Sequence, residues 1–164
     1  MIAALAGGII GVVVTRALEE PPSRRAAPAS PSPPPEEVLK VGETATTLRG
    51  NDVTVEDFVP SVRLANTPKG QIFSEAAVKY CVGGSEVTVA VGVVSRLFSV
   101  RLDNGSEATV APGVPGEDLL DESQSIIGRG RCVKGNLFFL RPEDAKPNSV
   151  VYKGYSTVTW ELAA

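Results

Sequence analysis

From residue 38 onward, short runs of β-branched and aromatic residues are separated by turn-forming residues. Within several runs apolar and polar positions alternate with a period of two, which is the pattern of a strand with one buried face. Phe98, Val100 and Leu102 alternate in this way and precede Asp103-Asn104-Gly105, a strong hairpin signal. No run in this part keeps a helical period, so we expect an all-β domain built as a two-sheet β-sandwich. The strands are expected at residues 38–47, 53–59, 62–65, 76–82, 87–93, 98–102, 108–111, 131–140, 150–152 and 157–162.

The two cysteines of the chain both lie in strand-like runs. Cys132 belongs to the run 131–140, the most apolar and aromatic run outside the N-terminus, and Cys81 belongs to the run 76–82. We interpret these runs as two core strands tied by a Cys81–Cys132 disulfide, which indicates an oxidising compartment. The period of two places Cys81 opposite the bulkier face that contains Tyr80, which is in mild tension with a core disulfide and which a bulge would resolve. The alternative is two buried free thiols in a cytosolic protein.

The N-terminal run 2–14 contains no charged residue. At about 1.5 Å per residue a helix of this length covers about 20 Å, less than the ~30 Å hydrocarbon core of a bilayer. Extension to Leu18 brings it close to that thickness, because the charged end of Arg16 can reach outward. No basic region precedes the run, as it would in a cleavable signal peptide. We therefore expect one apolar helix, an uncleaved signal anchor over residues 1–18 that enters the membrane through residues 2–18.

The segment 19–37 contains seven prolines and no aliphatic residue larger than alanine. Such a segment cannot bury enough apolar surface to fold, and its prolines favour an extended polyproline II conformation. At about 3.1 Å per residue its reach is on the order of 50–60 Å. We expect a disordered Pro-rich linker over residues 19–37, which holds a domain of residues 38–164 away from a surface.

Composition limits the chemistry that the domain can perform. Histidine is absent, which removes the usual general base near neutral pH, the commonest transition-metal ligand and a conventional catalytic triad. The net charge of −3 gives no basis for nucleic-acid binding, which requires a clustered basic surface. The loop 112–124 carries carboxylates that resemble calcium ligands, but their spacing matches no calcium loop. These carboxylates belong to Glu117, Asp118, Asp121 and Glu122.

The arginines after the apolar run and the expected disulfide point to opposite conclusions about topology. Arg16, Arg24 and Arg25 follow the apolar run, and by the positive-inside rule they favour a cytoplasmic domain. The disulfide favours an extracytoplasmic one, and we follow the disulfide.

A small basic patch beside Cys132 is expected to be a solvated strand face or a rim for an acidic envelope polymer. It consists of Arg129, Arg131 and Lys134.

Several short motifs, in this order and spacing, carry a family resemblance over about residues 38–164. They are Val41-Gly42-Glu43-Thr44, Lys79-Tyr80-Cys81-Val82, the run 98–105, Cys132-Val133-Lys134-Gly135 with Phe139, the turn 142–147, and Trp160-Glu161-Leu162. Together they resemble an immunoglobulin-like domain family of unknown function, found in secreted and membrane-anchored proteins of actinobacteria and other Gram-positive bacteria. Its fold is similar to that of the mycobacterial immunoprotective extracellular antigen.

The resemblance implies an extracytoplasmic, immunoglobulin-like β-sandwich without known catalytic residues. In actinobacterial members a cysteine often occupies each of the two strand positions, which supports the Cys81–Cys132 bridge. Trp160 departs from true immunoglobulin domains, because their core tryptophan lies between the two cysteines.

These inferences lead to an expected function. We expect a non-enzymatic binding or structural module, anchored in the bacterial cell membrane by a single pass, with its C-terminal domain extracytoplasmic. Its partner is expected to be a protein or a cell-envelope polymer, without nucleic acid and without a cofactor. The alternative is a calcium-binding protein or a hydrolytic enzyme built on a β-sandwich.

Overall fold

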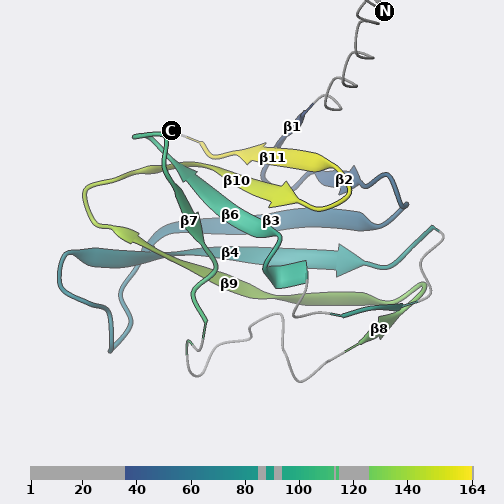
Figure 1. Ribbon diagram of the computed structural model, residues 1–164, viewed down its shortest axis with the longest axis horizontal. Coiled ribbons are helices and arrows are strands. Elements are labelled where there is room, and N and C mark those ends of the chain that lie inside the picture. The colour runs from purple at the N-terminus through teal and green to yellow at the C-terminus, as the bar shows by residue number, and fades with distance from the viewer. Residues whose placement is uncertain (1–35, 85–87, 91–93, 113, 115–125, 164) are drawn as a thin grey trace, which may run out of the picture. The chain divides into compact units, whose positions relative to one another are not determined.

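The computed structural model describes residues 36–84, 88–90, 94–112, 114 and 126–163, which form two large β-sheets and one short ribbon (Figure 1). The larger sheet has five strands. In spatial order they are β1 (Glu37–Lys40), β11 (Thr157–Glu161), β10 (Pro147–Lys153), β6 (Phe98–Leu102) and β7 (Glu107–Thr109).

The second sheet has four strands, and all of its neighbouring strands are antiparallel. In spatial order they are β2 (Thr44–Thr46), β3 (Asp52–Val62), β4 (Gln71–Cys81) and β9 (Cys132–Pro142). A two-stranded ribbon pairs β5 (Thr88–Val89) with β8 (Ile127–Gly128).

Side chains from both sheets meet in one hydrophobic core, so the described part of the chain is an all-β sandwich, as the pattern predicts. Phe98, Val100 and Leu102 all belong to this core, which confirms the alternation expected for β6. Trp160 is fully buried, and its indole Nε1 donates a hydrogen bond of 2.9 Å to the carbonyl oxygen of Glu43. The largest core side chains are those of Trp160, Tyr80, Tyr152, Phe98, Phe139 and Leu137.

The first expected strand is in fact two strands that belong to different sheets. β1 runs parallel to β11, whereas β2 is antiparallel to β3. The chain changes sheet near Gly42, which has a φ of 94°. Glycine adopts this left-handed conformation readily because it has no Cβ. The backbone N–H of Gly42 donates to the carbonyl of Val55 at 2.7 Å, which fixes the change of direction.

The neighbouring strands are longer than the hydrophobic pattern predicts. β3 contains the expected run 53–59 and continues through Pro60 to Val62, whereas residues 63–65 of the next expected strand lie outside any strand, so that strand was predicted wrongly. One of the two shifts in its register with β4 lies between Val59 and Val62 and therefore spans Pro60. A proline fits such an irregularity because it has no N–H to donate. β4 begins at Gln71 rather than at residue 76. The hydrophobic pattern missed its first half because a polar residue, the fully buried Ser74, occupies an inward position there.

Some expected features lie outside the described residues. These are the segment 1–18, the linker up to residue 35 and the four carboxylates Glu117, Asp118, Asp121 and Glu122. Among the described residues, no helix has the length and apolar character required to cross a bilayer. The membrane anchor and the linker therefore stay predictions from the sequence.

Candidate functional site

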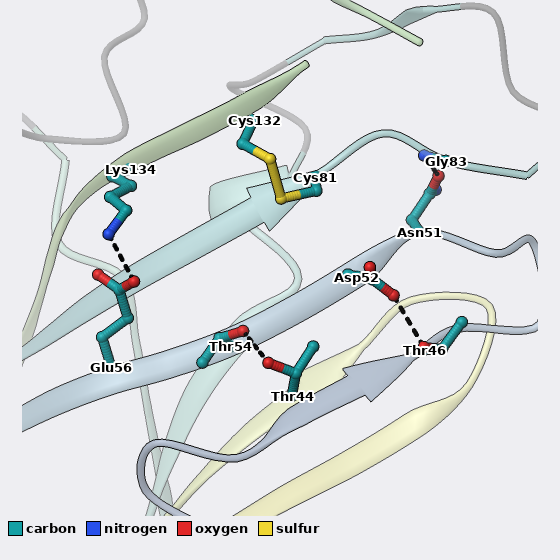
Figure 2. The surroundings of a disulfide bond; sticks show 10 residues. All are labelled: Thr44, Thr46, Asn51, Asp52, Thr54, Glu56, Cys81, Gly83, Cys132 and Lys134. Carbon is teal, nitrogen blue, oxygen red and sulfur yellow. Dashed lines mark hydrogen bonds and ion pairs between the residues drawn. A yellow bond between two sulfur atoms is a disulfide. The ribbon is translucent and has the colours of Figure 1, made fainter. Parts of the chain in front are cut away.

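The disulfide lies within the four-stranded sheet. Cys81 ends β4, Cys132 begins β9, and the two residues are directly opposite each other in the antiparallel register. Their Cα atoms are 4.0 Å apart and their side chains form a disulfide (Figure 2). The register from Gln71 and Pro142 to the two cysteines contains no shift, so the bridge links two adjacent strands rather than the two sheets.

The bridge faces outward, away from the core. Tyr80 and Val133, the neighbours of the cysteines within their strands, are buried in the core at 2% and 5% exposure. Because side chains alternate along a strand, Cys81 and Cys132 point to the opposite face. Cys81 is half-buried and Cys132 is exposed. The expectation of a core disulfide with a bulge was therefore wrong, whereas the period-two placement of Cys81 was correct.

Two rows of polar side chains cross this outer face beside the disulfide. Each row contains one residue from each of β2, β3, β4 and β9, paired in register. The first row ends on the bridge itself, and the second lies two residues away along the strands. The first row is Thr46, Asp52, Cys81 and Cys132, and the second is Thr44, Thr54, Lys79 and Lys134.

The threonines of these rows are already hydrogen-bonded across β2 and β3. The Thr46 hydroxyl donates to Oδ1 of Asp52 at 2.8 Å, and the hydroxyls of Thr44 and Thr54 are 2.7 Å apart (Figure 2). Cross-strand pairs of this kind contribute a few tenths to about 1 kcal/mol each. This part of the face is therefore ordered before any partner binds.

The lysines give the β4 and β9 half of the face its charge. Lys79 and Lys134 are directly opposite each other in the register. Lys134 Nζ donates to Oε1 of Glu56 at 2.6 Å, and this ion pair is largely exposed (Figure 2). Arg129 and Arg131 of the expected basic patch are exposed as well. Since Glu56 is an acid, the face around Lys134 carries charges of both signs rather than a purely basic rim.

A buried amide holds the end of the sheet that carries the disulfide. Asn51 is fully buried; its Nδ2 donates to the Tyr80 hydroxyl at 2.8 Å, and its Oδ1 accepts from the Gly83 N–H at 3.0 Å. The turn before β3 is thereby fastened to the chain just after Cys81. The sequence marks this stretch only as a turn, because the partners of Asn51 are far away in the chain.

A buried guanidinium lies at the opposite end of β9. Arg141 is 4% exposed, and every nitrogen of its guanidinium donates to an oxygen of the chain. Burial lowers the pKa of Arg141, while the nearby Asp103 and Glu143 act in the opposite direction. The accepting oxygens are the hydroxyls of Ser74 and Ser61 and the carbonyls of Pro60, Pro142 and Ala145.

An ion-pair network covers part of the outer face of the five-stranded sheet. Glu107 accepts from Lys153 Nζ at 2.5 Å and from the Ser99 hydroxyl at 3.1 Å, and it lies 4.0 Å from the Arg101 guanidinium. The hydrogen bond from Lys153 is the main cause that lowers the pKa of Glu107; burial opposes it. The network links β6, β7 and β10.

An apolar hollow lies on the outer face of the four-stranded sheet, away from the disulfide. Phe73 and Phe138 meet there edge to face, with ring centroids 6.3 Å apart. Beside them is a space of about 390 Å³. Sequence reasoning missed it, because the run 131–140 was interpreted only as a core strand and nothing in it places Phe138 on the outer face. Its lining consists of Leu64, Ala65, Asn66, Pro68, Phe73, Ala111, Pro112, Val114 and Leu140.

Together these features define a β-sandwich protein with an outward-facing disulfide between adjacent strands. No family model matches the chain, and no curated protein matches its sequence. Its fold is similar to that of MPT63, a secreted protein from Mycobacterium tuberculosis, with a TM-score of 0.59 and 21% identity over 79% of this chain and 99% of that one.

A second similar structure is an uncharacterised β-sandwich protein from Clostridium difficile. Its TM-score is 0.53 and its identity 10%, over 79% of this chain and 95% of that one. At these identities the likeness concerns the fold alone. It supports the expected resemblance at the level of a β-sandwich, whereas membership of an actinobacterial family stays a prediction.

Proposed function

We propose that this chain is a non-enzymatic binding or structural module that a single apolar segment anchors in the bacterial cell membrane, with an immunoglobulin-like domain on the extracytoplasmic side. The observation that carries the proposal is the outward-facing Cys81–Cys132 disulfide. Disulfides persist in oxidising compartments and are rare in the cytosol. A bridge that solvent reaches is also more open to cellular thiols than a buried one.

The state of the ionisable groups supports a non-enzymatic role. Catalytic acids and bases usually have pKa values displaced towards neutrality. The pKa of Glu107 is instead lowered by its hydrogen bond from Lys153, and Arg141 is engaged by oxygens of its own chain. Both networks join strands to one another, which is a structural use of charge.

The outer face beside the disulfide supports a polar partner. Its ordered threonine hydroxyls and mixed charges match the hydrogen-bonding groups of a cell-envelope polymer or of another protein's surface. A Pro-rich linker that ends before β1 would hold this face away from the lipid headgroups. Nucleic acid is not a proposed partner.

Protease added to intact cells that carry the full chain tests the topology. We expect cleavage within residues 19–37 and release of a domain that contains the Cys81–Cys132 bridge, while a cytosolic marker protein stays intact. If the domain is cleaved only after lysis, it faces the cytoplasm and the proposal is wrong.

The calcium-binding alternative has a separate test. Native mass spectrometry with excess calcium compares the full chain with a double variant that carries Glu117→Gln and Asp121→Asn. We expect the same calcium content in both proteins. A stoichiometric calcium ion that this double variant loses would replace the proposed function.

A further inference from the structure

The disulfide is accessible from two directions. Cys132 is exposed on the outer face, and β9 is an edge strand of the four-stranded sheet. The described contacts at the free side of β9, the bridge between Val110 and Phe139 and the bond from Ala111 N to Phe138 O, lie at the other end of the strand. Within the described chain, the Cys132 end of β9 is thus bordered by β4 on one side only.

Charged side chains of both signs lie near the two sulfur atoms: Asp52 is directly opposite Cys81 in the register, and two lysines lie farther along the strands. Lys79 and Lys134 lie two residues from Cys81 and Cys132 on the same face, about 7 Å along the strands. Lys134 forms an ion pair with Glu56, whereas no ion pair of Lys79 occurs among the described residues. Cationic neighbours attract an incoming thiolate and stabilise a departing one.

Backbone hydrogen bonds pair the two strands on both sides of the bridge. Beyond the cysteines, Val82 N donates to Arg131 O at 2.9 Å, and Gly130 N donates to Val82 O at 2.7 Å. Before them, β4 and β9 stay in continuous register back to Gln71. Hydrogen bonds therefore hold the two cysteines opposite each other on both sides, in addition to the disulfide.

We propose that Cys81–Cys132 is a thiol–disulfide exchange site that reacts in the native fold with a dithiol of a partner molecule, and that Lys79 is a positioning charge for this reaction. This goes beyond the proposed function, which needs only a stable bridge. A partner thiolate attacks Sγ of the exposed Cys132, the bond to Sγ of Cys81 breaks, and Cys81 leaves as a thiolate that takes a proton from water.

The second thiol of the partner completes the reaction. As a thiolate it attacks the partner's own sulfur in the mixed disulfide, and Cys132 is released as a thiolate. Two electrons have then passed from the dithiol to the bridge, and the partner carries a disulfide. A partner disulfide reverses these steps and restores the bridge.

Dithiothreitol serves as the dithiol probe for the full chain without denaturant, with alkylation and mass spectrometry as the readout. We expect a reduction rate that is first order in dithiothreitol and unchanged by urea concentrations below the unfolding transition, because attack occurs on the folded protein. A rate that rises in step with the unfolded fraction, or no reduction until the protein unfolds, overturns the proposal.

Glutathione identifies the sulfur that is attacked. As a monothiol it lacks the second thiol that would release it by intramolecular attack, so the mixed disulfide can be trapped by alkylation and should map to the exposed Cys132 in clear excess over the half-buried Cys81. A mixed disulfide located mainly on Cys81 overturns the assigned route.

A matched pair of variants tests the positioning charge. Lys79→Gln should slow reduction by dithiothreitol about twofold to threefold at low salt and flatten its dependence on ionic strength, since one cation near the sulfurs is removed. The control is Lys69→Gln, an exposed lysine just before β4, about 30 Å or more from Cys81 along the strand. Equal rates and equal salt dependence in the two variants overturn the role of Lys79.

Discussion

Arg141 shows how a charge can be buried in this protein without a carboxylate in direct contact. A guanidinium has N–H groups directed around a plane, and here hydroxyl and carbonyl oxygens from three parts of the chain accept them. The partners Pro60, Ser74 and Ala145 become neighbours only when β3, β4 and the turn after β9 come together. No local pattern in the sequence contains that information, so a period-two analysis could not identify the cluster.

Replacing Arg141 tests how much the cluster contributes to the free energy of unfolding. Arg141→Met keeps much of the side-chain volume but leaves the buried carbonyl oxygen of Ala145 without this donor and removes the donor to the Ser74 hydroxyl, whereas the Pro60 carbonyl keeps its bond from Ser74. We expect the free energy of unfolding to fall by about 2 kcal/mol or more, because each unsatisfied buried group costs about 1–3 kcal/mol. Urea denaturation measures the change.

The control for this variant is Arg63→Ala. Arg63 forms an exposed ion pair with Glu143, and exposed pairs contribute about 1 kcal/mol or less. Similar losses for the two variants would mean that the cluster around Arg141 is not a special source of stability.

Acid should weaken the network around Glu107. Its pKa is lowered from 4.5 in the folded protein, chiefly by the hydrogen bond from Lys153. The stabilising contribution is therefore complete above pH 4.5 and is lost as the pH falls through the lowered value. Glu107→Gln should unfold more easily than the wild type above that pH and lose less stability below it. Parallel pH profiles from thermal unfolding, with a constant difference, would contradict this.

At the scale of elements, the sequence predicted best those strands in which apolar and polar residues alternate. β6 was expected at residues 98–102 and lies at Phe98–Leu102. In β9 the adjacent Phe138 and Phe139 are both buried, because Val114 packs on the outer face against Phe138. A segment that covers the outside of a sheet removes the alternation, and the sequence around Phe138 gives no sign of it. The start of β4 was missed because the buried Ser74 interrupts the apolar pattern, and the end of β3 because its residues 59–61 are exposed.

The turn region beside the disulfide depends on close backbone contact. Gly84 has a φ of 53°, and a Cβ at this position would lie 1.8 Å from the carbonyl oxygen of Arg49. Gly84→Ala should therefore lower the free energy of unfolding by about 3 kcal/mol, through conformational strain and steric overlap together. Gly105→Ala is the matched control, since its φ is 81° and nothing lies within 4 Å of its Cβ.

Denaturant unfolding of the two glycine variants separates the conformational strain of a positive φ from the steric overlap with Arg49. Gly105→Ala carries only the cost of a positive φ, about 1 kcal/mol. If Gly84→Ala is no more destabilised than Gly105→Ala, the contact between the two turns relaxes easily, and it does not fix the disulfide end of the sheet.

At the scale of the molecule, composition and pattern predicted the class of fold but not the surface that a partner would use. Alternating apolar residues require two faces that bury each other, and that requirement leads to a sandwich whatever the loops contain. The outer faces obey no such requirement, because solvent accepts many side chains there. The threonine rows, Lys79 and the hollow beside Phe73 follow from strand register, which pairs residues far apart in the chain. Fold alone therefore does not decide among the ligands that such faces can bind.

The boundary of the folded unit gives the last prediction. β1 pairs with β11 over four residues, Leu39 packs against the core, and Glu36 binds the hydroxyl of Thr159. Removing residues 1–35 leaves all of these contacts in place, so we expect a change in melting temperature of less than about 2 °C. Removing residues 1–41 deletes β1 and exposes the core edge near Trp160. Loss of the Leu39 contact alone costs about 1.5 kcal/mol or more, which corresponds to a fall of roughly 5 °C or more. Calorimetry of the two truncated proteins against the full chain distinguishes these cases. An equal fall for both would show that residues 1–35 stabilise the sandwich directly.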